Sequence, residues 1–408
     1  MIVDIINKKR LGEELSYKEL DFFFNGYLNG EVKDYQMSSL LMAICINGMT
    51  DEEIYSLTKI FIDSGDVLDF EDVLGIKVDK HSTGGIGDKT TLIIVPIVAS
   101  LGVPVVKMCG RGLGYTGGTI DKLESIPGFK INLTDNQVLR QVRDIGVVII
   151  GQTKNLAPMD KVIYALRDVT ATVSSIPLIA SSIMSKKIAS GADKILIDIK
   201  VGKGALLQTR EDAKKLSELM VKIGDVYHRE VRTIISDMNI PLGYAIGNSL
   251  EVKEAMDVLQ GKEYDNNLVN LCIELATEMV SMGKNISKKD ANELVLESLN
   301  KGRAYEKFLE LVKYQGGDLE KLEFAQKRKK IKAKESGVIK KIDALKLGKL
   351  SVALGAGRSS KEDKIDYGVG IKLNKLVGEY VNKGEVLATL YVNDNSKIID
   401  VDDIFVIK

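Results

Sequence analysis

Five short runs rich in Val and Ile constrain the fold of this chain more than any other feature. Each run is only a few residues long, and the segments between them are long enough to form a helix and return to the sheet. Apolar strands spaced in this way predict a parallel sheet that helices cover on both faces. The predicted strands are residues 76–78, 104–108, 147–150, 195–201 and 232–236.

The segments around this core predict helices. A capping box at Ser16 and Glu19, in which each side chain accepts from the other's free backbone amide, indicates a helix near the N-terminus. Residues 160–190 have no strand signal and interrupt the α/β pattern with two predicted helices. We therefore expect residues 1–66 and 158–190 to pack together as one discontinuous helical domain.

The rest of the chain predicts two further domains, because 408 residues are too many for one ordinary core. We expect the parallel sheet to occupy residues 67–157 and 191–326, followed by a basic run at 327–332 that predicts a solvated linker. Residues 332–408, rich in Val, Ile and Gly with turn signals, predict a small β-rich domain. The expected fold class is α/β, with a helical domain, a parallel-sheet α/β domain and a small C-terminal α+β domain.

Composition narrows the class of protein. Lysine plus arginine equals aspartate plus glutamate, at 57 each, and a neutral total argues against a dedicated nucleic-acid binder. The three cysteines form no CxxC pair, so they predict neither a disulfide framework nor a zinc site and favour a reducing compartment. The N-terminal apolar stretch is too short for a signal peptide, and the longest apolar run, residues 92–106, is too broken for a membrane span. We expect a cytoplasmic protein without a nucleic-acid or membrane partner.

A glycine-rich segment between a predicted strand and a predicted helix carries the strongest functional signal. It reads VDKHSTGGIGDKTT, residues 78–91, and its glycines let the backbone present amides to an anion at a helix N-terminus. Lys80, Ser82 and Thr91 add one charge and two hydroxyls. The lysine spacing of this segment does not match a Walker loop, and the segment lacks GxGxxG, so ATP and NAD are poor candidates for it. His81 is one of only two histidines, and its place beside a lysine in this loop favours a general acid.

A second glycine-rich turn repeats this arrangement. The run VPVVKM leads into CGRGLGYTGGTIDKLE, residues 109–124, which again predicts a strand, a turn and a helix. Lys107, Thr119 and the backbone at Gly117 and Gly118 are in position to reach the same anion. Ligands of open α/β sheets bind at the carboxyl ends of the strands, where both turns are expected to lie.

The helical segment YALRDVTATVSSIPLIASSIMSKK offers a cationic surface for a second ligand. Ser182 and Lys186 are four residues apart and face one side of a helix, and Arg167 ends the preceding helix. An arginine, a hydroxyl and a lysine on one surface can grip a planar, electron-rich heterocycle and stabilise negative charge as it leaves. A solvated helix face explains the same spacing equally well.

The chain resembles the pyrimidine nucleoside phosphorylase and thymidine phosphorylase family from end to end. The resemblance is carried by VDKHSTGGIGDKTTL, KMCGRGLGYTGGTIDKLESIPGF, IIGQTKNLAP, IYALRDVTATV and SIPLIASSIMSKKIASGAD. It implies a homodimer that uses inorganic phosphate to split a pyrimidine nucleoside into free base and pentose 1-phosphate, without an organic cofactor. The segments ASLGVPVVKM and SDMNIPLGYAIGN resemble the broad type, acting on uridine, thymidine and deoxyuridine, more than the thymidine-restricted type.

The resemblance also implies roles for individual residues. For phosphate binding it implies Lys80, His81, Ser82, Thr91, Lys107, Met108, Cys109 and Thr119. For the pyrimidine it implies Tyr164, Arg167, Ser182 and Lys186, with His81, Arg167 and Lys186 as the catalytic residues. Bacterial members of the pyrimidine type hold a monovalent cation, which implies potassium at Gly87, Lys89, Leu242, Ala245 and Glu254, mostly through backbone carbonyls.

Three positions depart from the family pattern. Cys109, Tyr115 and Lys89 stand where the family has a serine, a histidine and a small residue, and a thiol is a weaker donor than a hydroxyl.

Other functions stay open from the sequence. One is an anthranilate-type phosphoribosyltransferase, which shares a Gly-Gly-Asp loop but needs a diphosphate-bearing sugar and magnesium. Another is a hydrolase. A carrier or binding protein built around the C-terminal module is a third.

Overall fold

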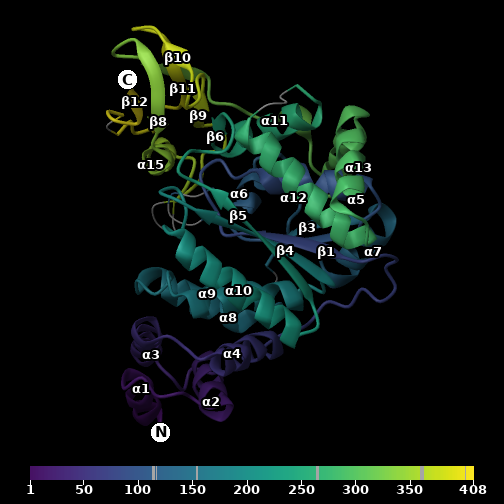
Figure 1. Cartoon of the computed structure of the whole chain (residues 1–408), viewed down its shortest axis with the longest axis vertical. Helices are drawn as coiled ribbons and strands as arrows, with labels where there is room; N and C mark the ends of the chain where they lie inside the picture. Colours follow the sequence, from purple (N-terminus) through teal and green to yellow (C-terminus); the bar gives the residue numbers. More distant parts are fainter. Residues whose placement is uncertain (113–114, 116, 153–154, 263–265, 359–362, 400) are drawn as a thin grey trace.

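The computed structural model spans the whole chain and describes every residue except 113–114, 116, 153–154, 263–265, 359–362 and 400 (Figure 1). Four helices form its N-terminal end, and two later helices pack against them. The predicted capping box is present, since the Ser16 hydroxyl accepts from the Glu19 amide at 3.4 Å. Phe61 and Met159, far apart in sequence, share one apolar cluster. These helices are α1 (Ile2–Arg10), α2 (Tyr17–Leu28), α3 (Asp34–Asn47), α4 (Asp51–Asp63), α8 (Pro158–Val169) and α9 (Ile176–Ala189).

Five strands form the centre of the molecule, and each pairs in parallel, as predicted. They form the groups β1–β4–β5 and β2–β3, and the Val78 amide donates to the Pro104 carbonyl at 3.1 Å where β1 and β2 meet. Along β4, Ile195 and Ile197 belong to one apolar cluster and Leu196 to another, so both faces of the sheet are buried. The strands are β1 (Val78–Ser82), β2 (Val105–Cys109), β3 (Val147–Gly151), β4 (Lys194–Val201) and β5 (Glu230–Asp237).

The predicted position of the first strand, residues 76–78, is wrong: β1 begins only at Val78 and continues through the charged residues of the sequence motif to Ser82. Asp79 and Lys80 are both fully buried in this strand. Asp79 Oδ2 lies 2.6 Å from Lys187 Nζ, and Lys80 Nζ lies 3.3 Å from Asp198 Oδ2. An apolar pattern does not predict a strand whose buried positions are filled by ion pairs.

Helices cover the two faces of the sheet (Figure 1). α9 and α10 lie on one face, and α5 and α12 lie on the other. None of the described helices is long and apolar enough to cross a membrane. The remaining helices of this part are α5 (Thr90–Ser100), α6 (Thr119–Glu124), α7 (Asp135–Ile145), α10 (Arg210–Val226), α11 (Asn248–Leu259), α12 (Asn267–Lys284), α13 (Lys288–Asn300), α14 (Arg303–Tyr314) and a 3-10 turn (Leu319–Lys321).

The basic run predicted as a linker is instead an edge strand, β7, paired antiparallel with β11. Lysine-rich edges are common because charged side chains discourage pairing with a further chain. The C-terminal unit also contains α15, whose Gly348 packs so closely on the second glycine-rich turn that a Cβ there would lie 2.9 Å from the Tyr115 carbonyl. Its elements are β7 (Lys327–Lys332), β8 (Gly337–Ile342), α15 (Ala344–Leu354), β9 (Gly370–Leu373), β10 (Tyr380–Val381), β11 (Val386–Val392) and β12 (Phe405–Ile407). The short strand β6 (Ala245–Ile246), from the middle of the chain, pairs with β9 at the edge of its sheet. The domain limits given above stay predictions.

Candidate active site

The first glycine-rich turn joins β1 to α5. Gly84 and Gly87 have φ angles of +89° and +72°, in the left-handed region that glycine adopts without strain. The turn leads into the first residues of an eleven-residue helix, where backbone N–H groups have no partner within the helix. This geometry is suited to an anion, as the sequence predicts.

A polar network on Asp88 holds two of the predicted phosphate ligands. The Ser82 and Thr90 hydroxyls donate to the two carboxylate oxygens of Asp88 at 2.5 and 2.6 Å, and Lys80 Nζ donates to Thr90 Oγ1 at 2.7 Å. Burial opposes ionisation of Asp88, but Lys200 and Lys80 outweigh it and hold the pKa of Asp88 far below its usual range. Lys80 and Ser82 therefore lie in one network around an ionised carboxylate.

A second buried carboxylate, Asp198, continues this network below the turn. Its Oδ2 atom lies 2.7 Å from Lys200 Nζ and 3.3 Å from Lys80 Nζ, and the side chains of all three residues are fully buried. Buried charges are stable only when they are paired. Sequence reasoning missed Asp198 and Lys200, although two charges inside the apolar run ILIDIKV were a signal that could have found them.

The end of β2 is joined to β1 by a third set of charges. Lys187 Nζ lies 2.6 Å from Asp79 Oδ2 and donates to the Met108 carbonyl at 3.1 Å, and Lys107 Nζ donates to the same carbonyl at 3.0 Å. Burial lowers the pKa of Lys187 to about 8, despite the opposing attraction of Asp79. Lys187, which sequence reasoning missed, thus connects the two strand ends from α9.

His81 lies among these lysines at the carboxyl end of β1, partly buried. Burial, followed by repulsion from Lys187, Lys107, Lys186 and Lys80, holds its pKa well below the ordinary value of 6.5. The imidazole is therefore neutral at pH 7 in the free protein. Lys186 belongs to the group predicted to bind the base, so His81 lies where the two halves of the predicted site meet.

The second glycine-rich turn supplies fewer contacts. Cys109 is buried at the end of β2, where its thiol interacts with Lys107, and Thr119 is the first residue of α6. Residues 113–114 and 116 of this turn lie outside the described part of the chain. Among the described residues, no hydrogen bond joins Thr91 or Thr119 to the network around Lys80. The structure therefore does not bring these two threonines into that network.

The four residues predicted to bind the base lie together on α8 and α9. Lys186 Nζ donates to Ser182 Oγ at 3.0 Å and lies 5.4 Å from the centre of the Tyr164 ring, which is itself 5.7 Å from the Arg167 guanidinium carbon. Burial raises the pKa of Tyr164. Lys186 also contacts Asp160 Oδ2 at 2.6 Å, while the buried Oδ1 has no hydrogen-bond partner among the described residues. Asp160, four residues before Tyr164 on the same helix face, was not predicted.

Arg167 holds the connection between α8 and α9. It is almost fully buried, and its three guanidinium nitrogens donate to the carbonyls of Thr172, Val173 and Leu178 at 3.3, 2.9 and 3.1 Å. Burial lowers its pKa, and Asp160 opposes this shift. A guanidinium has five N–H donors, so Arg167 retains two after making these bonds. It positions the surface that carries Ser182 and can still donate to a ligand.

The predicted potassium site does not fit a metal ion in this chain. Lys89 Nζ donates to the carbonyls of Leu242 and Ala245 at 2.9 and 2.8 Å and to Glu254 Oε2 at 2.5 Å. The oxygens that the resemblance assigned to the cation are therefore bound to an ammonium group. Of the two remaining predicted donors, the Gly87 carbonyl accepts from the Lys89 amide and the Lys89 carbonyl accepts from the Leu92 amide, each at 2.9 Å. The predicted residues do come together, but around Lys89 instead of around potassium.

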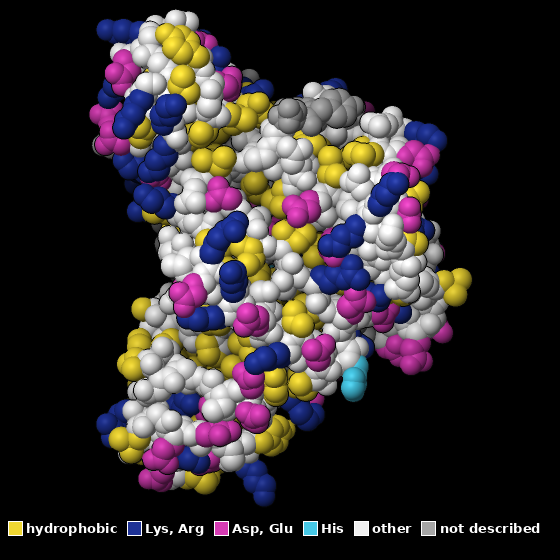
Figure 2. All heavy atoms as spheres, viewed as in Figure 1, with side chains coloured by type: hydrophobic (Ala, Val, Ile, Leu, Met, Phe, Trp, Pro, Cys, Tyr) yellow, Lys and Arg dark blue, Asp and Glu magenta, His cyan; other side chains and the backbone are white. Residues whose placement is uncertain are grey.

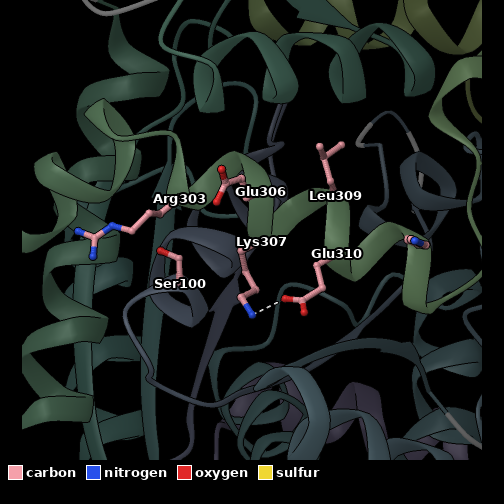
Figure 3. A pocket seen from close by; sticks show the side chains of 7 residues that line it. Ser100, Arg303, Glu306, Lys307, Leu309 and Glu310 are labelled. Atoms are coloured by element: carbon pink, nitrogen blue, oxygen red, sulfur yellow. Dashed lines mark hydrogen bonds and ion pairs between the residues drawn. The ribbon is translucent and has the colours of Figure 1, made fainter.

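One surface hollow of about 570 Å³ lies away from both glycine-rich turns, between Ser100 and α14 (Figure 3). Charges of both signs line it, and Lys307 Nζ pairs with Glu310 at 2.5 Å, as the dashed line shows. None of the predicted site residues contributes to this hollow. We therefore place the candidate site at the ends of β1 and β2 instead.

The chain matches three known families in succession. Residues 3–65 match the glycosyl transferase family helical bundle domain, residues 74–305 the glycosyl transferase family a/b domain, and residues 338–403 the pyrimidine nucleoside phosphorylase C-terminal domain. Among solved structures, the chain is similar to anthranilate phosphoribosyltransferase from Thermus thermophilus, with a TM-score of 0.61 over 76% of this chain and 99% of that chain. At 18% identity this likeness shows the fold alone.

Curated relatives are similar over nearly the whole chain. The pyrimidine-nucleoside phosphorylase of Bacillus subtilis (strain 168) is 52% identical over 399 residues, which cover 96% of this chain and 92% of that protein. The pyrimidine-nucleoside phosphorylase of Staphylococcus epidermidis (strain ATCC 12228 / FDA PCI 1200) is 50% identical over 410 residues, which cover 99% and 94%. These similarities confirm the predicted fold class, and the chain belongs to the pyrimidine-nucleoside phosphorylase family.

Proposed function

We propose that this protein catalyses the reversible phosphorolysis of pyrimidine nucleosides to free base and pentose 1-phosphate. One observation carries the proposal: His81, at the end of β1, is near enough to the lysine cluster of β1 and β2 and to Lys186, in the second cluster on α8 and α9, for the charges of both clusters to lower its pKa. The first cluster suits a phosphate dianion, and the second suits the carbonyls of a pyrimidine. The activity named for relatives that share half of their residues with this chain supports the same reaction.

The residues divide the work of an in-line displacement at the anomeric carbon. Lys80, Lys107 and the amides of the first turn hold the phosphate nucleophile. As the glycosidic bond breaks, negative charge develops on the base, and His81, Arg167 and Lys186 stabilise it. Donors fixed in advance, within a site that excludes water, stabilise such a charge far better than solvent does. The product sugar phosphate then has inverted configuration at the anomeric carbon.

The assay that tests this function measures release of uracil from uridine with and without inorganic phosphate, in the absence of magnesium. We expect cleavage to require phosphate and to yield ribose 1-phosphate. Cleavage without phosphate would indicate a hydrolase, and a requirement for magnesium and a diphosphate-bearing sugar would indicate a phosphoribosyltransferase. Parallel assays with thymidine and deoxyuridine test the proposed broad preference against a thymidine-restricted one.

Phosphate binding should weaken above pH 8, because Lys187 has a pKa of about 8 in the free protein. Phosphate stays a dianion as the pH rises, whereas the Lys187 ammonium loses its proton and with it the attraction. The KM for phosphate should therefore rise above pH 8 by at most about tenfold per pH unit, the limit for one proton. Steady-state kinetics from pH 7 to 9.5 measure this. Lys187→Met should bind phosphate weakly with little change over that range, and a constant KM in the wild type would contradict the assignment.

A homodimer is proposed on the basis of an exposed apolar stripe on α3. Tyr35, Met42 and Ile46, spaced seven and four residues apart, lie on one face of that helix and are 70%, 39% and 75% exposed. Val3 on the adjoining α1 is also exposed. Apolar side chains are visible at this end of the molecule (Figure 2). Exposed apolar side chains that gather on one face mark interaction sites.

Ile46→Asp should convert the dimer to a monomer, because it places a charge within the proposed interface. Light scattering coupled to size-exclusion chromatography measures the mass. The matched control is Leu74→Asp, since Leu74 is 93% exposed on a loop outside α1 and α3 and its substitution should leave a dimer. A wild-type protein with the mass of a single chain would remove the proposal.

We also propose that the protein works in the cytoplasm. Cys45, Cys109 and Cys272 are all free thiols, and Cys109 lies beside Lys107 in the phosphate half of the site. Free thiols persist in a reducing compartment. Cell fractionation followed by immunodetection tests this, and recovery outside the cytoplasmic fraction would contradict it.

A further inference from the structure

The Lys89 ammonium carries a positive charge at the position where the family resemblance predicts a bound monovalent cation. The side chain of Lys89 is fully buried, and Nζ donates to three oxygens: the Leu242 carbonyl, the Ala245 carbonyl and Glu254 Oε2. An ammonium has three N–H donors, so all of them are used. The Lys89 side chain therefore takes no part in binding a ligand and instead holds its three acceptors together.

The acceptor set has the chemistry of a site for a hard cation, with two carbonyl oxygens and one carboxylate. Glu254 also accepts from the Tyr244 and Ala245 amides at 2.6 and 2.8 Å, so both of its oxygens already have donors. The single positive charge of Lys89 balances the single negative charge of Glu254. A second cation here would leave an uncompensated positive charge in a buried place, which is strongly unfavourable. A Cβ on Gly87 would lie 2.6 Å from the Leu242 carbonyl, so this turn packs closely on the acceptors.

We propose that Lys89 replaces a monovalent cation in this enzyme and that its activity is independent of potassium. This inference rests on the proposed phosphorolysis only for its kinetic readout. Lys89 lies between Asp88 and Thr90, which hold Lys80 and Ser82 in the phosphate network. Its ammonium joins this turn to Glu254 on α11 and to Ala245 on β6. Lys89 is thus a positioning residue for the phosphate loop.

The test compares the wild type with Lys89→Ser, which removes the ammonium and leaves a small hydroxyl beside the same oxygens. In buffers with choline as the only monovalent cation, the wild type should have the same kcat/KM for phosphate as in potassium chloride. Lys89→Ser should lose at least about tenfold in choline, the scale typical of residues that position a binding site, and potassium should restore activity. Its melting temperature should also rise with potassium concentration, because a ligand that binds only the native state stabilises it.

The matched control is Lys253→Ser, next to Glu254 on α11. Lys253 is exposed and pairs with Asp257, so its substitution should create no potassium requirement. The melting temperature of the wild type should not change between choline and potassium at equal ionic strength. This measurement needs no catalysis, so it distinguishes failure of the inference from failure of the proposed function.

Two results would overturn the proposal. One is a wild type whose activity or melting temperature falls in choline and recovers with potassium, a result that stands even if Lys89→Ser fails to fold. The other is a folded Lys89→Ser variant that potassium neither activates nor stabilises, since the acceptors would then not form a cation site without the ammonium.

Discussion

Replacing His81 with asparagine should lower kcat/KM for uridine by about 10²–10³, the usual effect of removing one preorganised donor from a transition state. The pKa of the imidazole is depressed by burial and then by Lys187, Lys107, Lys186 and Lys80, so lysines from both the proposed phosphate group and the proposed base group act on it. Asparagine keeps a donor but shortens the side chain, so it should not reach the departing base. Initial rates of uracil release at saturating phosphate measure the effect.

The chain offers a matched control, because it has only one other histidine. His228 is exposed and has a φ of +54°, which asparagine tolerates better than most residues. His228→Asn should therefore retain full activity and an unchanged melting temperature. Near-normal turnover in His81→Asn, with phosphate still required, would remove His81 from the catalytic residues while leaving the phosphate site intact.

The protonation state of His81 refines the general-acid role predicted for it. A neutral imidazole can donate a hydrogen bond to the base, but it lacks the extra proton that an imidazolium would transfer. Phosphate brings negative charge among Lys80, Lys107 and Lys187, and this offsets the repulsion that lowers the His81 pKa. Histidine NMR of His228→Asn, in which one imidazole remains, should therefore show a titration well below pH 6.5 that moves upward when phosphate is added.

The apolar strands were predictable from sequence, and the charged ones were not. β2, β3 and β4 are buried on both faces, so their Val and Ile runs predict them within one or two residues. β1 contains two adjacent buried charges, Asp79 and Lys80, whose partners lie on other elements, and β7 consists almost wholly of exposed lysine and arginine. Both β1 and β7 are strands because their backbones pair with a neighbouring strand, and that neighbour lies more than 50 residues away in sequence.

Much of the candidate site was also predictable, because glycine-rich turns and helical spacing are local signals. The structure shows that Lys80, Ser82 and Lys107 lie near His81, and that Ser182 and Lys186 lie together. What the sequence could not predict are the partners that balance these charges, such as Asp79 for Lys187 and Asp198 for Lys80. Lys89 is the clearest example, since its charge is useful only because Leu242, Ala245 and Glu254 converge on it.

Arg167→Lys should lower kcat/KM for uridine by about 10²-fold although the positive charge is kept. Arg167 spans three carbonyls in the connection between α8 and α9, whereas a lysine ammonium is a point charge that cannot reach all three in that geometry. Each hydrogen bond to a charged group contributes about 1.5–3 kcal/mol, so the connection should also become less stable. Thermal unfolding should show a lower melting temperature together with the loss of activity.

Measuring activity and melting temperature together distinguishes an arginine that positions the site from one that only binds the base. If Arg167 did no more than donate to the pyrimidine, Arg167→Lys would raise the KM for uridine and leave the melting temperature unchanged. Because Ser182 and Lys186 follow the connection that Arg167 holds, we expect kcat and stability to fall together. Lys161→Arg, an exposed substitution on the same helix, is the control and should change neither. A variant with normal stability and a normal kcat would show that the three carbonyl contacts do not position the base-binding surface.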